Sequence, residues 1–423
     1  MRNRAGFTFL LFSFFGSCVL LTSCFSGGNN KAGRESGQQP AFDPGTYGYD
    51  VSFLKEHSVE TIELIDGESG GRVLIAPGYQ GRVMTSASGP EGKSYGWINY
   101  DFIRDGKTST QFNPVGGEER FWLGPEGGPF SIYFAEGVEQ VFGNWKVPPV
   151  IDTEPFDVVE VTPESARFGK TFELTNASGF RMSMEVDRRV RVLTGSEAEN
   201  LLGVSLGEKF GFVAFETENT LRNTGTGEWS EDKGFLSIWL LCMFNPSDKG
   251  VVFIPFRGGS EQELGPRVKD DYFGRIPAKR LIVREDVLFF NIDGKYRSKL
   301  GIPPERALPM CGSYDADTRT LTILWYSQPE ISQRYVNSQW GAQEDPLKGD
   351  VVNSYNDGPA DDGSIMGPFY ELESSSPAAL LKPGEEIRHS QRIFHITGDE
   401  DLLSEITVKL FNLKLEEIKT AFR

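Results

Sequence analysis

Histidine is scarce in this 423-residue sequence, and the few histidines present do not form a metal-binding pattern. They are His57, His389 and His395, and none stands in a His-x-His spacing. Cysteine is also rare, with four in the chain and no Cys-x-x-Cys pair. Zinc motifs built on such pairs are therefore excluded, and the sequence predicts no metal and no cofactor.

Two cysteines, Cys242 and Cys311, follow Cys24 in the chain. An exported protein could join them in a disulfide. However, Cys242 lies within the apolar run FLSIWLLCMF, which is typical of a buried strand, and a buried free cysteine behaves as a small apolar side chain. Two buried thiols are therefore favoured, and the disulfide remains the alternative.

Positive charge is in deficit. The chain has 43 Lys and Arg against 60 Asp and Glu, for a net charge of −17. Nucleic-acid phosphates require clustered Lys and Arg, so nucleic acid is disfavoured as a partner. Broad contact with anionic lipid is disfavoured for the same reason.

Only one stretch of the sequence is apolar over a long run, and it lies at the N-terminus. Arg2 and Arg4 precede FTFLLFSFFGSCVLLTSC, whose ending Leu-Thr-Ser-Cys resembles the bacterial lipobox, in which the Cys is acylated. We expect a lipoprotein signal peptide at 1–23, a lipid such as palmitate on Cys24, and a flexible tether over 24–44. The expected location is the cell envelope of a Gram-negative bacterium, on its periplasmic or outer-membrane face. A plain signal peptide or a membrane anchor is the alternative.

The sequence also lacks the strand–helix alternation of parallel sheets and any repeat of fixed length, which argues against a doubly wound fold. Most segments alternate apolar and polar residues with a period of two, as half-buried strands do. Strands are predicted at 72–76, 131–135, 156–193, 251–256, 288–292 and 320–327. A 3.6-residue apolar stripe is convincing only over 399–423, which predicts a C-terminal helix. The expected fold is all-β: a single large antiparallel β-supersandwich over 45–423 with few short helices.

Aromatic residues are well represented, with seven Trp and thirteen Tyr. Sugar faces stack on aromatic rings, so this composition suits carbohydrate binding, although most such rings are expected in the core. Trp122, Trp145 and Trp340 lie in Gly- and Pro-rich contexts and are favoured as stacking platforms. Trp239 and Trp325 lie in strand-like runs and are predicted to be core residues.

Four segments in order resemble the galactose mutarotase (aldose 1-epimerase) superfamily, whose fold is a β-supersandwich. They are GGRVLIAPGYQGRVMTSA (70–87), VGGEERFWLGPEGG (115–128), the stretch 215–244, and LESSSPAALLKPGEEIRH (372–389). Three further segments, YFGRIP, DGKYRSKLGIPPERA and GDVVNSYNDGP, resemble an uncharacterised branch of secreted bacterial lipoproteins. The resemblance implies a protein that handles sugars.

Mutarotation needs a base that removes the proton of the anomeric hydroxyl and an acid that protonates the ring oxygen. The resemblance implies that Glu373, in the closing Leu-Glu motif, is the base. It also implies one histidine before the double glycine and another in the middle of the chain, but Val115 and Asn219 stand there. Val cannot donate a proton and Asn does not exchange one near neutral pH. The usual mutarotase mechanism is therefore compromised.

Further residues are candidates for contacts to a sugar. Glu371 shares a strand face with Glu373 by the period of two, and guanidinium groups suit hydroxyls or uronate carboxylates. His389 and His395 share a face for the same reason, where a structural role is the more common one. The predicted substrate-binding residues are Arg82, Arg120, Trp122, Asn219, Arg297, Glu371 and His389.

The loop NDGPADDGS (356–364) concentrates oxygen ligands that suit Ca²⁺, namely Asn356, Asp357, Asp361 and Asp362. Its spacing matches no EF-hand, and such clusters usually form turns.

The sequence therefore predicts a lipid-anchored protein that binds carbohydrate in a cleft beside Glu373 and supports glycan use. A sugar-active enzyme is the alternative: an epimerase with a substituted acid, or a glycan hydrolase or lyase, with Glu373 as base. An envelope scaffold without a glycan site is the third class.

Overall fold

The computed structural model describes residues 42–207, 210–329, 331–360 and 363–423. The expected signal peptide, the lipidation site Cys24 and most of the expected tether lie outside these residues. Ala41–Arg423 form one compact unit. No helix of the described residues is both long and apolar enough to cross a bilayer.

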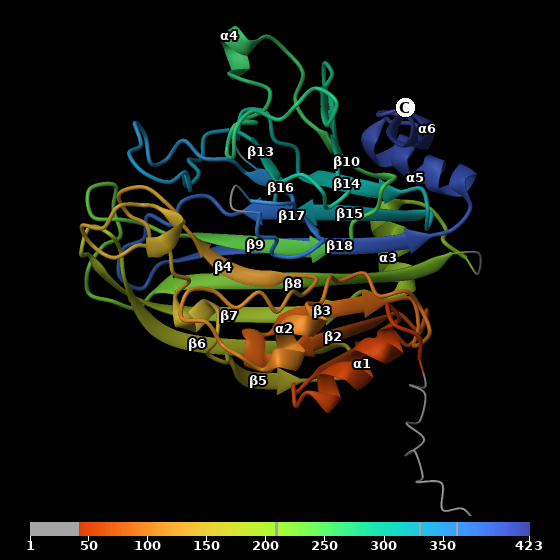
Figure 1. Cartoon of the computed structure of the whole chain (residues 1–423), viewed down its shortest axis with the longest axis horizontal. Coiled ribbons are helices and arrows are strands. Elements are labelled where there is room, and N and C mark those ends of the chain that lie inside the picture. The colour runs from red at the N-terminus through yellow and green to blue at the C-terminus, as the bar shows by residue number, and fades with distance from the viewer. Residues whose placement is uncertain (1–41, 208–209, 330, 361–362) are drawn as a thin grey trace, which may run out of the picture. The chain divides into compact units, whose positions relative to one another are not determined.

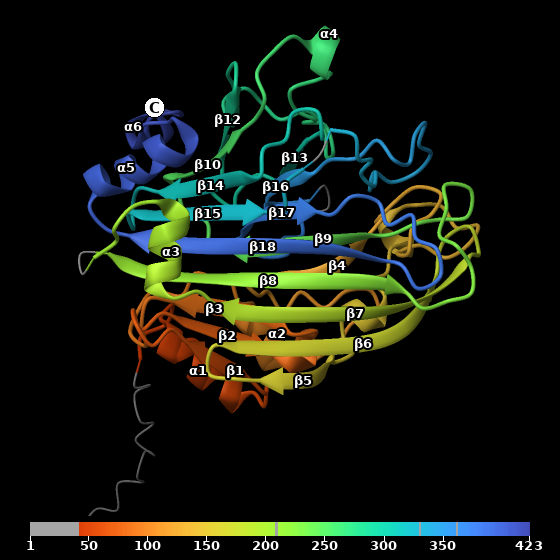
Figure 2. The ribbon, with the colours of Figure 1, turned by 180° about the vertical axis from the view of Figure 1, so that it is seen from behind.

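A ten-stranded antiparallel sheet forms one layer of the fold (Figures 1 and 2). In spatial order its strands are β11 (Leu281–Val283), β12 (Val287–Asn291), β10 (Gly250–Pro255), β14 (Met310–Asp315), β15 (Thr320–Tyr326), β18 (Glu386–Thr397), β8 (Gly211–Asn223), β7 (Arg181–Val192), β6 (Ser165–Thr175) and β5 (Asp157–Val161).

Two smaller antiparallel sheets lie in front of it in Figure 1. The five-stranded sheet has the order β13 (Ser298–Ile302), β16 (Val352–Asn356), β17 (Tyr370–Ser375), β9 (Ser237–Phe244) and β4 (Arg120–Gly124). The three-stranded sheet consists of β1 (Ile62–Ile65), β2 (Arg72–Ala76) and β3 (Arg82–Ala87). This is the large antiparallel β-sandwich predicted from the period-two pattern.

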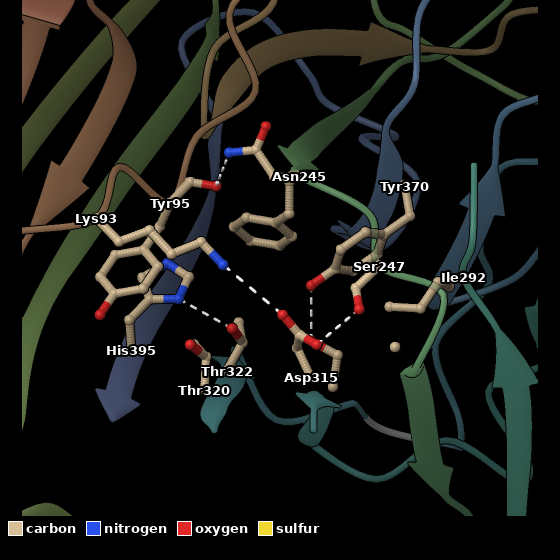
Figure 3. Close-up of a pocket in the computed structure, with 13 residues that line it drawn as sticks. Lys93, Tyr95, Asn245, Ser247, Ile292, Asp315, Thr320, Thr322, Tyr370 and His395 are labelled. Carbon is tan, nitrogen blue, oxygen red and sulfur yellow. Dashed lines mark hydrogen bonds and ion pairs between the residues drawn. The ribbon is translucent and has the colours of Figure 1, made fainter. Parts of the chain in front are cut away.

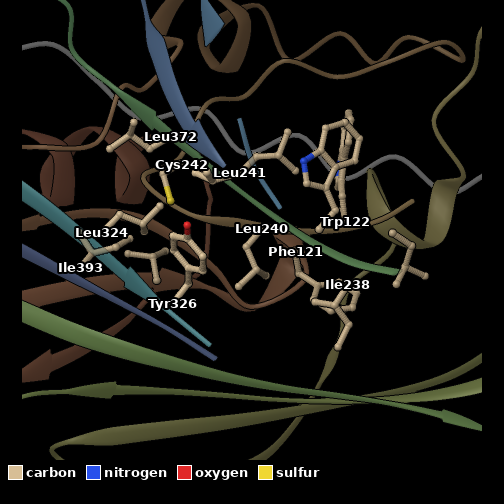
Figure 4. Packing of buried hydrophobic residues seen from close by; sticks show 14 of the residues in the cluster. Phe121, Trp122, Ile238, Leu240, Leu241, Cys242, Leu324, Tyr326, Leu372 and Ile393 are labelled. Atoms are coloured by element: carbon tan, nitrogen blue, oxygen red, sulfur yellow. The ribbon is translucent and has the colours of Figure 1, made fainter. Parts of the chain in front are cut away.

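The main core lies between the five-stranded and the ten-stranded sheets (Figure 4). Leu240 and Leu372 of the smaller sheet belong to the same buried cluster as Leu324 and Ile393 of the larger one. Cys242 also lies in this cluster. Both Cys242 and Cys311 are free and buried, in agreement with the two thiols favoured from the sequence.

Most of the helices pack against the ten-stranded or the three-stranded sheet. The α-helices of the described residues are α1 (Tyr47–Glu56), α2 (Tyr100–Asp105), α3 (Gly195–Leu202), α4 (Glu261–Leu264), α5 (Glu400–Phe411) and α6 (Leu415–Lys419). Buried side chains of α3, α5 and α6 form a second cluster with the outer face of the ten-stranded sheet, across which α3 lies in Figure 2. The predicted C-terminal helix is two helices, because the chain leaves α5 at Asn412 in the left-handed conformation.

One predicted strand was wrong, and two helices were not located from the sequence. Residues 131–135, predicted as a strand, form a buried loop in which Ile132 N–H donates to the carbonyl of Pro125 and Tyr133 Oη to that of Leu123. The alternating pattern at 131–135 therefore reflects burial of most of these side chains, and not pairing with another strand. The helices α1 and α3 were missed, although α3 begins with a capping box between Thr194 and Glu197, a local signal that was readable in the sequence.

Candidate functional site

One face of the five-stranded sheet carries a row of charged and aromatic side chains. β17 lies at the centre of that sheet, so both of its neighbours contribute to the row. Glu373 pairs with Leu241 of β9 and with Asn353 of β16, and Arg120 of β4 pairs with the same Leu241. Because side chains at paired positions share a face, Glu371, Glu373 and Arg120 lie on one side of the sheet.

Glu373 is the most enclosed member of this group, with 0% of its surface exposed. Its Oε2 atom accepts a hydrogen bond of 2.9 Å from Trp239 Nε1 and one of 2.8 Å from Lys299 Nζ. Its other oxygen, Oε1, is buried and has no hydrogen-bond partner among the described residues. The carboxylate is thus neutralised on one side and left free on the other.

Glu371, two residues earlier, forms a buried ion pair with Arg120, with 3.0 Å between Oε1 and Nη2. The guanidinium of Arg120 lies 4.1 Å from the ring centre of Trp122, a distance typical of a cation–π contact. Its Nε and Nη1 atoms are buried without a hydrogen-bond partner in the described part of the chain. Burial raises the pKa of the Glu371 carboxyl to about 7, because Arg120 offsets only part of that effect and Glu373 adds to it.

Lys299 connects this group to a second layer of polar side chains. Its ammonium lies 4.9 Å from the ring centre of Trp239 and 5.6 Å from that of Tyr272. Burial opposes the charge of Lys299, but the carboxylates of Glu373 and Glu126 outweigh burial and raise its pKa. Burial also raises the pKa of Glu126, despite the charge of Lys299 and the hydrogen bond from Trp340.

Tyr272 hydrogen-bonds Asp350, which completes the polar surroundings of Lys299. Burial raises the pKa of the Asp350 carboxyl, although Tyr272 opposes that shift. Asn353 donates from Nδ2 to the carbonyl of Leu300 at 3.1 Å. The arrangement therefore offers carboxylates, two cations and aromatic faces on one surface, the set of groups that holds the hydroxyls and the apolar faces of a sugar.

Two predicted binding residues, Asn219 and His389, belong to the ten-stranded sheet and lie inside the sandwich. Ser374 follows Glu373 and points into the sandwich, where its Oγ is 2.8 Å from Nε2 of His389. Burial lowers the pKa of His389 to about 3, so its ring is neutral. Asn219 accepts a bond of 2.8 Å from Arg188 Nη1 and donates to the His389 carbonyl. The structure therefore brings Arg120 to Glu373, but neither Asn219 nor His389.

Arg82 and Arg297 lie at the margins of the group. Arg82 on β3 is buried and donates to the carbonyl of Gly116 at 2.8 Å. Burial lowers its pKa to about 9, and the nearby charge of Arg120 contributes. Arg297 lies over the ring of Phe273 at 4.1 Å. Val115, in the position of an expected histidine, belongs to a separate apolar cluster.

His395 lies inside the sandwich beside a small polar pocket (Figure 3). Its Nε2 is 2.9 Å from Glu118 Oε1, and its Nδ1 is 2.9 Å from Thr322 Oγ1. Lys93 and Asp315 face each other across the pocket at 3.7 Å. His389 and His395 share the inner face of β18, as their spacing predicted, and each is engaged by neighbouring side chains.

No group of side chains suited to a metal ion occurs within residues 42–207, 210–329, 331–360 and 363–423. In the loop considered for Ca²⁺, Asp357 accepts bonds from Tyr355 Oη and from the Gly367 N–H. Asp361 and Asp362 lie outside the described residues.

Lys299 and Trp239, the two residues that hold Glu373, were not identified from the sequence. Trp239 was predicted to be a core residue because it lies in an apolar run, and its ring is indeed buried. Lys299 stands two residues after Arg297, so the two side chains share a face of their strand. Placing that face on the side of Glu373 requires the pairing of β13 with β16, which the sequence does not reveal. Of the rings favoured as stacking platforms, Trp122 lies in this group, while Trp145 and Trp340 lie beside it.

Comparisons with known proteins identify a family but no activity. A model described as a family of unknown function (DUF6786) matches residues 45–422. No curated protein sequence matches the chain.

Several solved structures are similar to this chain at low identity. A putative aldose 1-epimerase from Escherichia coli K12 has a TM-score of 0.48 and 10% identity, with 80% of this chain and 100% of that chain covered. A galactose mutarotase-like protein from Lactobacillus casei ATCC 334 has a TM-score of 0.45 and 10% identity, with 79% and 100% covered. A putative mutarotase from Salmonella typhimurium has a TM-score of 0.43 and 13% identity, with 81% and 91% covered.

Galactose mutarotase-like and aldose 1-epimerase-like proteins, the superfamily that the sequence resembles, are thus among the structures similar to this chain. Their TM-scores lie below 0.5, so they carry no argument about the site. That argument rests on this chain's own residues.

Proposed function

The chain belongs to the DUF6786 family of unknown function, and we propose that it binds a carbohydrate on the face of the five-stranded sheet around Glu373. The observation that carries the proposal is a set of buried polar atoms without partners among the described residues. They are Oε1 of Glu373 and Nε and Nη1 of Arg120. Buried polar atoms are almost always hydrogen-bonded in native proteins, so such a cluster on one face indicates a place for a polar ligand.

The chemistry of the neighbours supports a sugar over other polar ligands. A carboxylate oxygen accepts a bond from a hydroxyl, and the free guanidinium N–H groups donate to one, so Glu373 and Arg120 together suit a polyol. The indole rings of Trp122 and Trp239 lie on the same face, and their centres are 5.7 Å apart. Aromatic rings of this kind contact the apolar C–H face of a pyranose, which a simple anion lacks.

A ligand must reach Glu373 past side chains that retain some exposure. The Lys299 side chain is 12% exposed, whereas that of Glu373 is fully covered. Trp340 is half-buried and hydrogen-bonds Glu126. The charges of Lys299 and Glu373 both shift the pKa of Glu126. We propose that the ligand enters beside Lys299 and Trp340 and displaces the contact between Trp340 and Glu126.

A second candidate is a sugar-active enzyme with Glu373 as the base, and the raised pKa of Glu371 favours it. A carboxyl with a pKa of about 7 can hold a proton at neutral pH beside a carboxylate paired with Lys299. In an epimerase, Glu373 would remove the proton of the anomeric hydroxyl and Glu371 would protonate the ring oxygen. Glu371 would thereby replace the histidine acid, whose expected positions carry Val115 and Asn219.

We also propose that Cys24 carries a lipid and holds the protein at the cell envelope. The basic N-terminus, the single apolar run and the Leu-Thr-Ser-Cys sequence support it. Metabolic labelling with a palmitate analogue should label the wild-type protein and not Cys24→Ala. Equal labelling of both proteins would contradict the lipid assignment.

The binding proposal is tested with a glycan array followed by calorimetry. Wild type should bind at least one sugar, and Glu373→Gln should weaken that binding about tenfold or more, because an amide can no longer accept from both Lys299 and a hydroxyl. Glu218→Gln, which removes an exposed carboxylate of β8, is the control and should bind as wild type does. No binding on the array, or equal binding by Glu373→Gln, would refute the proposal.

An anomer-exchange assay distinguishes the enzyme from the binding protein. Exchange above the buffer rate by wild type, lost in Glu373→Gln and Glu371→Gln, would establish the epimerase. Exchange at the buffer rate by all three proteins would exclude the epimerase and leave the binding function.

A further inference from the structure

A row of aromatic rings runs from Glu373 toward the surface of the molecule. Trp239, which donates to Glu373, lies 5.7 Å from Trp122 between ring centres. Trp122 lies 6.5 Å from Trp145, and Trp145 stacks at 6.1 Å on Phe142 with 17° between the ring planes. The steps are therefore similar in length, and the row leads from a fully buried carboxylate to an exposed ring.

The outer end of this row is exposed to solvent. Phe142 is 62% exposed, and its neighbours Val138 and Val141 are also exposed. Trp145 is buried, yet its Nε1 has no hydrogen-bond partner in the described part of the protein. A buried tryptophan N–H usually has an acceptor, so this one indicates a polar ligand beside the ring.

A second aromatic ring flanks the outer end. Trp340 stacks on Trp145 at 6.3 Å with 25° between the planes. The two loops that carry these rings are joined by Gln140, whose Oε1 accepts bonds of 2.8 Å from the N–H groups of Gly128 and Gly341. Hydrogen bonds between the Gln140 side chain and the backbone thus hold the relative positions of the rings.

We propose that this row extends the sugar site and holds further sugar units, so that the ligand is an oligosaccharide or the end of a polysaccharide. The proposal rests on carbohydrate binding at Glu373. One sugar ring contacts one or two aromatic faces, which Trp122 and Trp239 already supply at Glu373. Phe142 is the exposed end of this row, where it would contact the following units by stacking, and Nε1 of Trp145 beside it would donate to one of their hydroxyls.

Two comparisons test the proposal: sugars of increasing length, and a variant of the outer ring, Phe142. Calorimetry compares glucose, galactose, mannose and xylose with their β-1,4- and α-1,4-linked oligomers from two to six units. Affinity should rise with length up to at least the trisaccharide. Phe142→Ala should weaken binding of the longer oligomers about 3- to 10-fold and leave that of the monosaccharide unchanged. Val408→Ala, which shortens an exposed side chain on α5, is the matched control and should change neither.

The outcomes separate this inference from the binding proposal. Monosaccharides that bind as tightly as oligomers, or an unchanged affinity of Phe142→Ala for the oligomers, would overturn the extended site and leave the sugar site at Glu373 intact. Binding of neither monosaccharides nor oligomers by wild type would refute both.

Discussion

Replacing Glu371 with Gln should change how the stability of the fold depends on pH. Burial raises the pKa of the Glu371 carboxyl to about 7 in the folded chain, against an ordinary value of 4.5. Between these two pH values the folded chain binds a proton that the unfolded chain has released, so the free energy of unfolding falls as the pH rises. A shift of this size corresponds to about 3 kcal/mol.

Glutamine is uncharged at every pH and resembles the protonated acid in shape and hydrogen bonding. The variant should therefore match wild type near pH 4.5 and exceed it by up to about 3 kcal/mol at pH 8. Urea unfolding of both proteins at several pH values measures this difference, in which the contributions of groups distant from Glu371 cancel. Glu218→Gln, whose carboxylate is 57% exposed in the wild type, is the control and should show no such trend. A constant difference between wild type and Glu371→Gln across this range would refute the reasoning.

Three further changes test the surroundings of the site and the interior of the sandwich. Lys299→Met leaves the Glu373 carboxylate buried without its cation and should destabilise the fold by about 3–5 kcal/mol at neutral pH. Lys295→Met, which removes an exposed ion pair, is the control, and an equally small effect of both variants would contradict this prediction. Trp239→Phe keeps the ring but removes its N–H donor to Glu373, so unfolding should become easier by about 1–3 kcal/mol, and unchanged denaturant curves would count against the bond. Burial lowers the pKa of His389 from 6.5 to about 3, so the unfolded chain takes up the proton first and stability should be lost as the pH falls between these values. His389→Asn should lessen that acid loss in circular-dichroism titrations, and an identical acid profile would exclude His389 as its source.

Much of the fold was readable from local patterns because the sandwich is built from half-buried strands. The long alternating segment 156–193 became the strands β5, β6 and β7. The same rule failed at 131–135, where alternation reflects a loop covered by neighbouring segments. The helix α1 was also not located from its sequence pattern, because it is stabilised by packing against β3 in a separate apolar cluster.

The candidate site could be predicted only in part, for a physical reason. Glu371 and Glu373 are close in sequence, and their shared face follows from the strand period alone. Lys299 and Trp239 reach Glu373 through the pairing of β13, β16, β17 and β9, and pairing between distant strands leaves no local signal. Asn219 was placed by resemblance, but it lies on β8 of the ten-stranded sheet, where it contacts Arg188 and the His389 carbonyl inside the sandwich.

The central position of β17 has a consequence for the order of folding. β17 is the last strand of the five-stranded sheet to be synthesised, yet β9 and β16 can be joined only through it. Arg120 and Trp239 lie on the paired strands β4 and β9, but Lys299 on β13 must wait for residues near 373 before it shares a surface with them. Contacts between residues so distant in sequence are associated with slow folding. The proposed sugar binding would thus report completion of the five-stranded sheet, and a chain ending before β17 would lack Glu373 and could not bind in this way, however well its earlier strands had folded.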